Sequence, residues 1–419
     1  MSALAALLPL ALIASGMPVF LALLAAAVAV TLWVAPMPPM VLHQVVFGGL
    51  DTYALLAVPF FILAGELMGR SGIAARLIAW ALALAGRIPG SLGVATVGAS
   101  AVMGVISGSS AAAVGVLGRA LYPRLVAEGW TPARAGGLIS AAGAIDIVLP
   151  PSIAMILYGL AAEQSVAQLF LAGIIPGLVI AAAMVGRVLV SARRMPAGAR
   201  LGLAEKLRAT RAAAAGLIMP VAILGGIWSG VFSPTEAGGF ACLYAIIVAR
   251  FLYRSMSWGE IVMAAGEAAI LSAKILIIVA AAGLMTYILT THGVPQALSG
   301  WIAAQALPGW AFLLAVNLVL LGVGCVLDPT SAILVLAPLL APAAVAAGVD
   351  AVHFGVVMTV NLAIGMFTPP FGLNLFVASA VTGLAAPVLW RGVLPFVLVQ
   401  CAALAVITYV PALSLALIR

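Results

Sequence analysis

The sequence predicts an all-α, polytopic membrane protein whose two halves repeat one architecture, with two re-entrant hairpins and two broken helices. Composition, the spacing of apolar segments and an internal repeat of glycine and proline predict this fold class. Of the 419 residues, 65% are hydrophobic and 7% are charged, whereas soluble domains carry about 25% charged residues. This composition excludes an ordinary cytosolic enzyme. Because backbone in lipid must satisfy its own hydrogen bonds, and no segment alternates as a barrel strand would, helices are expected.

Apolar segments that could cross a membrane recur along the chain, since a crossing needs roughly 20 apolar residues. The first lacks a basic leader and a cleavage motif, so we expect a retained helix rather than a signal peptide. The expected crossings lie near residues 3–34, 53–70, 73–88, 134–162, 169–192, 213–232, 236–253, 264–290, 352–382 and 392–418.

Residues 193–212 form the most basic segment of the chain, with six arginines and lysines. Lys and Arg gather in cytoplasmic loops, so this segment is predicted to be a cytoplasmic loop between a first repeat, 1–192, and a second repeat, 213–419. Five expected crossings precede this loop, so the N-terminus is expected outside the cell. The same count puts Arg70 and Arg76 near an outer turn, although arginines prefer the cytoplasmic side. The formal net charge of +7 therefore reflects membrane topology, and no nucleic-acid partner is expected.

Two apolar segments, about 91–130 and about 309–348, are too long for one helix and are interrupted in the middle by polar residues. Each is predicted to be a re-entrant hairpin, followed by a broken helix at about 134–162 and about 352–382. An overlay at an offset of 219 residues matches seven glycines and prolines of the two halves, including Gly129 with Gly348 and Pro150 with Pro369. Because five crossings precede the basic loop, the second repeat is expected to be inverted, as in secondary transporters.

Each repeat carries two interruptions, the hairpin tip and a Pro-Pro break in the helix that follows. A proline removes a hydrogen-bond donor and clashes with the preceding turn, so each break frees carbonyl oxygens. With the hydroxyls of the hairpin tips and the carboxylate of Asp328, these oxygens form ligand sets that suit alkali or alkaline-earth ions. Half-helix N-termini after each break attract an anionic group.

Several of these residues could instead have a purely structural role. Serine and threonine in membrane helices often bond to the carbonyl four residues earlier. Asp146 has no acidic counterpart in the overlay, where Gly365 stands. Lys274 is expected to pair with Glu267 or to reach the membrane surface, and the alternative is that it faces a substrate carboxylate. The three cysteines stand apart, and no disulfide framework or metal-binding cysteine pair is indicated.

Five motifs, in order along nearly the whole chain, resemble those of the large membrane subunit of tripartite ATP-independent periplasmic (TRAP) transporters. They are the runs Val58 to Met68, Ser107 to Ala111, Leu149 to Ile153, Ser233 to Ala237 and Phe367 to Gly372. The resemblance implies an inverted-repeat, elevator-type transporter of the bacterial inner membrane, which imports a small organic anion with sodium as coupling ion. It implies no enzyme activity and no organic cofactor. The implied partners are a small four-helix membrane subunit, expected as a separate chain, and a periplasmic substrate-binding protein.

Carried onto this sequence, the resemblance implies two sodium sites and a substrate region. The first sodium site would comprise Ser107, Ser109, Ser110, Gly143, Val148 and Pro150. The second would comprise Gly322, Cys325, Asp328, Thr330, Met366 and Thr368. The substrate region would include Ser152, Pro369, Pro370 and Asn374.

The sequence departs from the family pattern at Asp146, where an apolar residue is common. Two other functions compete with this interpretation. One is a self-sufficient sodium-coupled anion symporter of related inverted-repeat fold, which would need no partner proteins. The other is an intramembrane enzyme, but Ser107 has no evident histidine to activate it.

Overall fold

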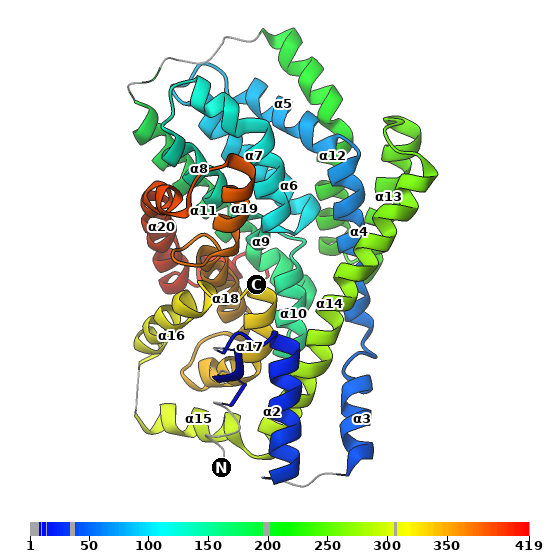
Figure 1. Ribbon diagram of the computed structural model, residues 1–419, viewed down its shortest axis with the longest axis vertical. Helices are drawn as coiled ribbons and strands as arrows, with labels where there is room; N and C mark the ends of the chain where they lie inside the picture. Colours follow the sequence, from blue (N-terminus) through cyan, green and yellow to red (C-terminus); the bar gives the residue numbers. More distant parts are fainter. Residues whose placement is uncertain are drawn as a thin grey trace.

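The computed structural model describes residues 8–9, 11–13, 15–33, 38–193, 195, 202–305 and 308–418, and within these ranges every regular element is a helix (Figure 1). The predicted all-α class is therefore confirmed. The elements up to the basic segment are α2 (Val19–Trp33), α3 (Pro39–Gly48), η1 (Tyr53–Leu56), α4 (Ala57–Arg70), α5 (Ile73–Ala85), α6 (Ser91–Ser107), α7 (Ser110–Ala127), α8 (Pro132–Ala142), α9 (Ile145–Val148), α10 (Ile153–Ala161) and α11 (Val166–Ala192).

The second half follows a similar order. Its elements are α12 (Leu203–Trp228), α13 (Pro234–Ile247), the short η2 (Val248–Leu252), α14 (Trp258–Thr291), α15 (Val294–Ala304), α16 (Gly309–Gly324), α17 (Pro329–Ala346), α18 (Ala351–Gly365), α19 (Leu373–Thr382), α20 (Ala386–Tyr409) and α21 (Ala412–Leu415).

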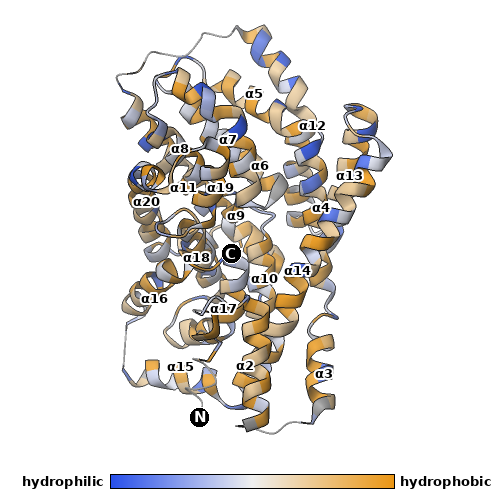
Figure 2. Ribbon diagram, viewed as in Figure 1, coloured by the Kyte–Doolittle hydropathy of each residue, from blue (hydrophilic) through white to orange (hydrophobic). Residues whose placement is uncertain are grey.

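Among the described residues, seven helices are long and apolar enough to cross a membrane, and an eighth span is added if α8–α9 and α10, bent by 46°, are counted as one. Figure 2 shows hydrophobic residues along most helices and hydrophilic residues gathered near the start of α12 and around the α13–α14 connection. This distribution is that of a multi-pass membrane protein.

The two interrupted segments fold as helix pairs. The overlay offset reappears in the helix bounds, because α7 spans Ser110–Ala127 and α17 spans Pro329–Ala346. Gly129 and Gly348 both have positive φ, and both Pro-Pro peptide bonds are cis. The first pair lies in the upper half of Figure 1, toward the α11–α12 connection, and the second lies in the lower half near α15. Re-entry of these pairs into a membrane stays a prediction.

A separate group of helices packs along one side of the molecule. α14 contacts α2, α3 and α4, and α13 contacts α4 and α12. Glu236 stabilises the start of α13, since its carboxylate accepts from the Ser233 backbone N–H at 2.8 Å and from the Ser233 hydroxyl at 2.7 Å. We call α2, α3, α4, α12, α13 and α14 the scaffold group.

The predicted crossing at 73–88 is wrong. α5 has only 13 residues, which span about 20 Å and fall short of the roughly 30 Å hydrocarbon layer. The Arg76 guanidinium lies 3.8 Å from the centre of the Tyr253 ring, and the Tyr253 hydroxyl donates to the Ala212 carbonyl at 2.8 Å. Arg76 therefore lies beside the basic segment, and its apparent conflict with the charge rule disappears together with the count of five crossings that produced it.

Two further expectations need correction. α12 begins at Leu203, so the last ten residues of the expected loop 193–212 are helical, and the Gly202 N–H donates to the Glu205 carboxylate at 2.9 Å. Alanine, leucine, lysine and arginine in this stretch favour a helix despite its polarity. In the expected crossing 3–34, residues 3–7, 10, 14 and 34 lie outside the described residues, and α2 begins only after the turn at Gly16.

Candidate ion and substrate site

A cavity of about 740 Å³ lies where the scaffold group meets the hairpin tips and the broken helices. α4 and α14 line one side, and α7, α9, α10, α17 and α19 contribute to the other. Five of the predicted site residues line its wall: Ser109, Ser110, Asp328, Thr330 and Met366. Hairpin tips and breaks from both halves of the chain therefore line one cavity. The side chain of Ser107 lies outside the described residues.

The first hairpin tip contacts the first break. Gly108 has a φ of +57°, and a Cβ built on it would lie 3.3 Å from the Pro151 carbonyl oxygen. Behind the tip, a Cβ on Gly143 would lie 3.0 Å from the Ser110 carbonyl oxygen. Glycine at both positions lets the backbone of the tip approach the backbone of the break. The tip and the break are therefore in direct contact, as the predicted first ion site requires.

Asn374, at the start of α19, links the second break to the first hairpin. Its Nδ2 donates to Ser110 Oγ at 2.7 Å and to the Ser140 carbonyl at 3.1 Å, and its backbone N–H donates to the Met366 carbonyl at 2.8 Å. Asn374 is fully buried. A residue predicted for the substrate region therefore joins the residues of the two predicted sodium sites.

Other residues of the first set are held in the core. The Val148 carbonyl oxygen faces α11, where a Cβ on Gly173 would lie 2.9 Å away. Pro150 and Ser152 are buried, and Ser152 Oγ accepts from the Met155 N–H at 3.4 Å as the N-cap of α10. Ser152 thus has a structural role at this helix start.

In the second set, three side chains have local partners. Asp328 caps α17, with its carboxylate accepting from the Ser331 N–H at 3.1 Å and from the Ser331 hydroxyl at 2.6 Å. Thr368 Oγ1 donates to the Ile364 carbonyl at 2.7 Å, and Cys325 Sγ donates to the Leu321 carbonyl at 3.0 Å. Both are bonds to the residue four positions earlier, as is common for such groups in membrane helices.

The remaining members of the second set surround the break. Gly322 has open space where a Cβ would stand, whereas a Cβ on Gly365 would lie 2.4 Å from the Gly324 carbonyl carbon. The first arm of this hairpin therefore contacts the broken helix backbone to backbone. Pro369 is half-buried and Pro370 is exposed, unlike their buried overlay partners Pro150 and Pro151.

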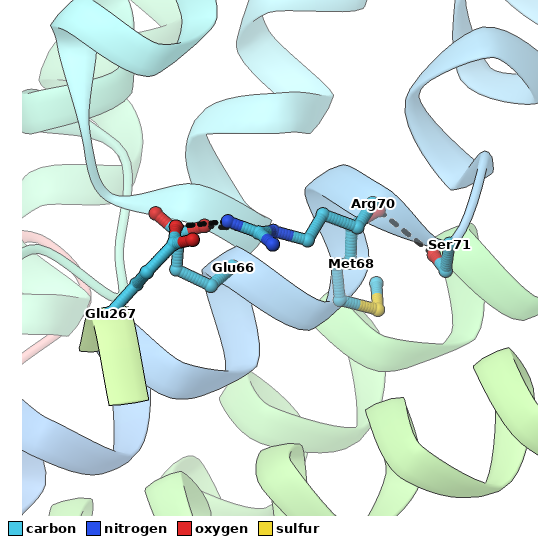
Figure 3. Close-up of polar contacts among 5 residues, drawn as sticks. All are labelled: Glu66, Met68, Arg70, Ser71 and Glu267. Atoms are coloured by element: carbon cyan, nitrogen blue, oxygen red, sulfur yellow. Dashed lines mark hydrogen bonds and ion pairs between the residues drawn. The ribbon is translucent and has the colours of Figure 1, made fainter. Parts of the chain in front are cut away.

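Charged side chains of the cavity wall include two that the sequence analysis did not select, Arg70 and Arg119. Arg70 lies 3.5 Å from Glu66, and it also pairs with Glu267 (Figure 3). Lys274 therefore does not pair with Glu267 as expected. It lines the cavity instead and has no ion pair among the described residues, nor has Arg119. Only tertiary structure brings Arg119, from α7, and Lys274, from α14, to one space.

The wall carries three cationic side chains, Arg70, Arg119 and Lys274, and two acidic ones, Glu66 and Asp328. Since Arg70 is already paired with two carboxylates, Arg119 and Lys274 are the better placed of the three to hold an anion. Within the described residues no group of three or more His, Cys, Asp or Glu side chains could hold a metal ion. The oxygen-rich tips and breaks can take a hard cation, and the wall beside them can take an organic anion.

Comparison with known proteins identifies the family of the chain. The family model of the tripartite ATP-independent periplasmic transporter, DctM component, matches residues 6–413. The C4-dicarboxylate TRAP transporter large permease protein of Pseudomonas aeruginosa is 42% identical over 88% of this chain and 86% of its own length. Its counterpart from Rhodobacter capsulatus is 36% identical over 97% of this chain and 96% of its own.

A solved structure, that of the YdaH transporter from Alcanivorax borkumensis, has a TM-score of 0.64, with 16% sequence identity and 88% of each chain covered. This likeness concerns the fold. The match of the family model over nearly the whole sequence, with relatives of this identity, shows that the chain is a large membrane subunit of the TRAP transporter family.

Proposed function

We propose that this protein imports a small organic anion by sodium-driven secondary active transport, with an elevator mechanism. The observation that carries the proposal is the single cavity in which residues of both hairpin tips and both breaks meet Arg119 and Lys274. Backbone and hydroxyl oxygens at the tips and breaks would bind sodium, and the two cationic side chains would attract the carboxylate of the substrate. The two relatives described above are named for C4-dicarboxylates, which makes a dicarboxylate the first substrate to test.

The proposed elevator mechanism rests on the division of the molecule into the scaffold group and a second group that contains the hairpins and broken helices. The hairpins and broken helices contact one another, as α7 does α19, and α20 packs against α8. We call α6 to α10 and α16 to α20 the transport group. The cavity lies between this group and the scaffold group. Movement of the transport group along the scaffold would carry ion and substrate across the membrane without separating them.

Five candidate spans lie between the two hairpins: the bent pair α8–α10, then α11, α12, α13 and α14. If each of these spans crosses the membrane, an odd number of crossings would put the second hairpin upside down relative to the first. This count does not include α5, so it supports the inverted repeat independently of the error at 73–88.

The partners implied by the family are a small membrane subunit held against the scaffold group and a periplasmic binding protein that delivers the anion. The location that follows is the bacterial inner membrane. Uptake of a labelled C4-dicarboxylate into proteoliposomes tests the proposal. Uptake is expected only with external sodium, the small subunit and the binding protein together. Uptake by this chain alone would instead establish the self-sufficient symporter.

A further inference from the structure

Asp146 is a fully buried carboxyl group in the transport group, on the short helix α9. Its Oδ1 lies 2.9 Å from Ser100 Oγ, which is also 2.7 Å from the Ala142 carbonyl. Its Oδ2 has no hydrogen-bond partner among the described residues.

The elements packed against α9 carry Arg119, Arg124, Arg134, Arg187 and His353, and none of these side chains forms an ion pair with Asp146. A buried carboxylate without a counter-charge is strongly unfavourable, so Asp146 is neutralised either by a proton or by a bound cation.

The position of this carboxyl group points to one cation in particular. A Cβ built on Gly104 would lie 2.5 Å from Asp146 Cα and 3.2 Å from its Oδ1. Gly104 is one turn before the first hairpin tip, and its carbonyl accepts from the Gly108 N–H at 3.0 Å. The Asp146 N–H donates to the Gly143 carbonyl at 3.2 Å. Asp146 thus belongs to one of the two segments from which the first sodium site would be built, and it packs against the helix that leads to the other.

The overlay of the two repeats supports the same assignment. Asp146 corresponds to Gly365, since 365 − 146 = 219, and Asp328 corresponds to Ser109, since 328 − 109 = 219. Gly365 leaves no room for a side chain against Gly324. Each repeat therefore has one acidic residue near its predicted ion site, on the broken helix in the first and at the hairpin tip in the second.

We propose that the carboxylate of Asp146 is the counter-charge of the first sodium ion. This inference rests on the proposed sodium coupling. The serine hydroxyls and carbonyls of the first site are neutral, so without Asp146 the ion's charge would be offset only by dipoles. With it, ion and carboxylate neutralise each other inside the transport group, and both are removed from water at a lower cost.

The test uses the full chain purified with its small subunit. Thermal unfolding is followed against increasing NaCl, with choline chloride keeping the ionic strength constant. The variants are Asp146→Asn and Asp146→Gly, the latter placing at 146 the residue found at the overlay position. Asp51→Asn, which changes an exposed acid outside the cavity wall, is the matched control.

We expect both Asp146 variants to raise the sodium concentration of half-maximal stabilisation about tenfold, the effect of one lost charge-assisted interaction. In choline alone, Asp146→Asn is expected to unfold at the same temperature as the unmodified protein or higher, because the amide has nearly the same shape as the carboxyl group and needs no counter-charge. An unchanged sodium response in both variants would overturn the inference, as would a lower unfolding temperature with an unchanged sodium midpoint, which marks a merely structural residue. Absence of any sodium response in the unmodified protein would instead contradict the proposed function.

Discussion

Asn374 shows at the scale of one residue how the two halves of the site depend on each other. Its amide joins Ser110 of the first hairpin tip to Ser140 of the first broken helix, although it belongs to the second half of the chain. We expect Asn374→Ala to destabilise the protein by about 1–3 kcal/mol, since buried partners lose their hydrogen bonds. Thermal unfolding of the detergent-purified protein measures this. Ser379→Ala, a change at a half-buried hydroxyl farther along α19, is the control, and equal losses in both variants would contradict a special role for Asn374.

Lys274 leads to a prediction about the substrate. Because it lines the cavity without an ion pair among the described residues, Lys274→Gln should raise the KM for the anion about tenfold, the effect of one lost charge-assisted contact. The sodium concentration of half-maximal uptake should stay unchanged. Lys274→Arg, which keeps the charge, is the control in the same proteoliposome assay. A KM unaffected by loss of the charge would mean that Lys274 does not meet the substrate.

Asp328 and Ser109 occupy equivalent positions at the starts of α17 and α7. Asp328→Asn keeps an oxygen to cap α17 but removes the charge, so we expect weaker sodium dependence with an almost unchanged unfolding temperature. Ser109→Ala should act in the same direction through the first site. Sodium titration of uptake is the measurement. A wild-type sodium response in both variants would remove both residues from the proposed ion sites.

The residues at the interruptions could be selected from the sequence, because glycine, proline and hydroxyl groups rarely coincide at matching breaks by chance. Their partners could not. Thr368 and Cys325 bond to carbonyls of their own helices, an outcome that depends on side-chain rotation. Arg119 lies nine residues beyond the start of α7 and Lys274 lies in a distant helix, so only packing reveals that they share a cavity with Asp328.

At the scale of elements, the contact of α8 with α20 brings the two halves together backbone to backbone. A Cβ on Gly392 would lie 1.9 Å from the Ala133 carbonyl oxygen, and one on Gly137 would lie 2.3 Å from the Gly392 carbonyl carbon. Side chains cannot enter here without moving a backbone, so the two helices touch directly. Gln400 adds a hydrogen bond from α20 to the Ala141 carbonyl at 3.1 Å.

We therefore expect Gly392→Ala to destabilise the protein by at least about 1–3 kcal/mol, since overpacking here displaces backbone rather than a flexible side chain. Gly225→Ala is the matched control, because its Cβ would meet nothing within 4 Å, and alanine is the better helix former by about 1 kcal/mol. Relative to the unmodified protein, the unfolding temperature should fall in Gly392→Ala and rise in Gly225→Ala. Similar stability in the two would show that α20 can shift away from α8.

Element boundaries were predicted well where glycine or proline interrupts a helix. They were predicted poorly where only the length of an apolar segment indicated where a helix ends. Proline and glycine locate both hairpin tips and both breaks within a few residues. α5 has the hydropathy of a crossing, but Gly86, with a φ of +63°, ends it after 13 residues. The start of α12 contains enough polar residues to resemble a loop, although its residues also favour a helix.

At the scale of the whole molecule, the orientation of the hairpins is the strongest test of the proposed topology. The base of the first hairpin lies by the basic segment, since a Cβ on Gly129 would be 4.0 Å from Met195 Cε. The charge rule places that end in the cytoplasm. The base of the second hairpin should then face the periplasm, because five spans separate the two hairpins.

Single cysteines at Glu128 and Ala346, both exposed positions at hairpin bases, test this orientation. They are introduced into a background without the three native cysteines and probed in whole cells with an impermeant thiol reagent. We expect labelling at 346 and not at 128. Equal labelling, or the reverse, would contradict the inverted repeat and with it the structural basis of the two ion sites. Labelling of both after the cells are opened shows that each position is reactive.

The direct contact of α8 with α20 has a thermodynamic consequence for sodium. The first broken helix and the last long helix of the second half are in direct backbone contact, and Asn374 ties the first hairpin tip to the second break. An ion that orders one site therefore also orders the other, and the second ion meets less conformational entropy to lose. Sodium activation should then be cooperative, with a Hill coefficient above one that Asn374→Ala brings toward one.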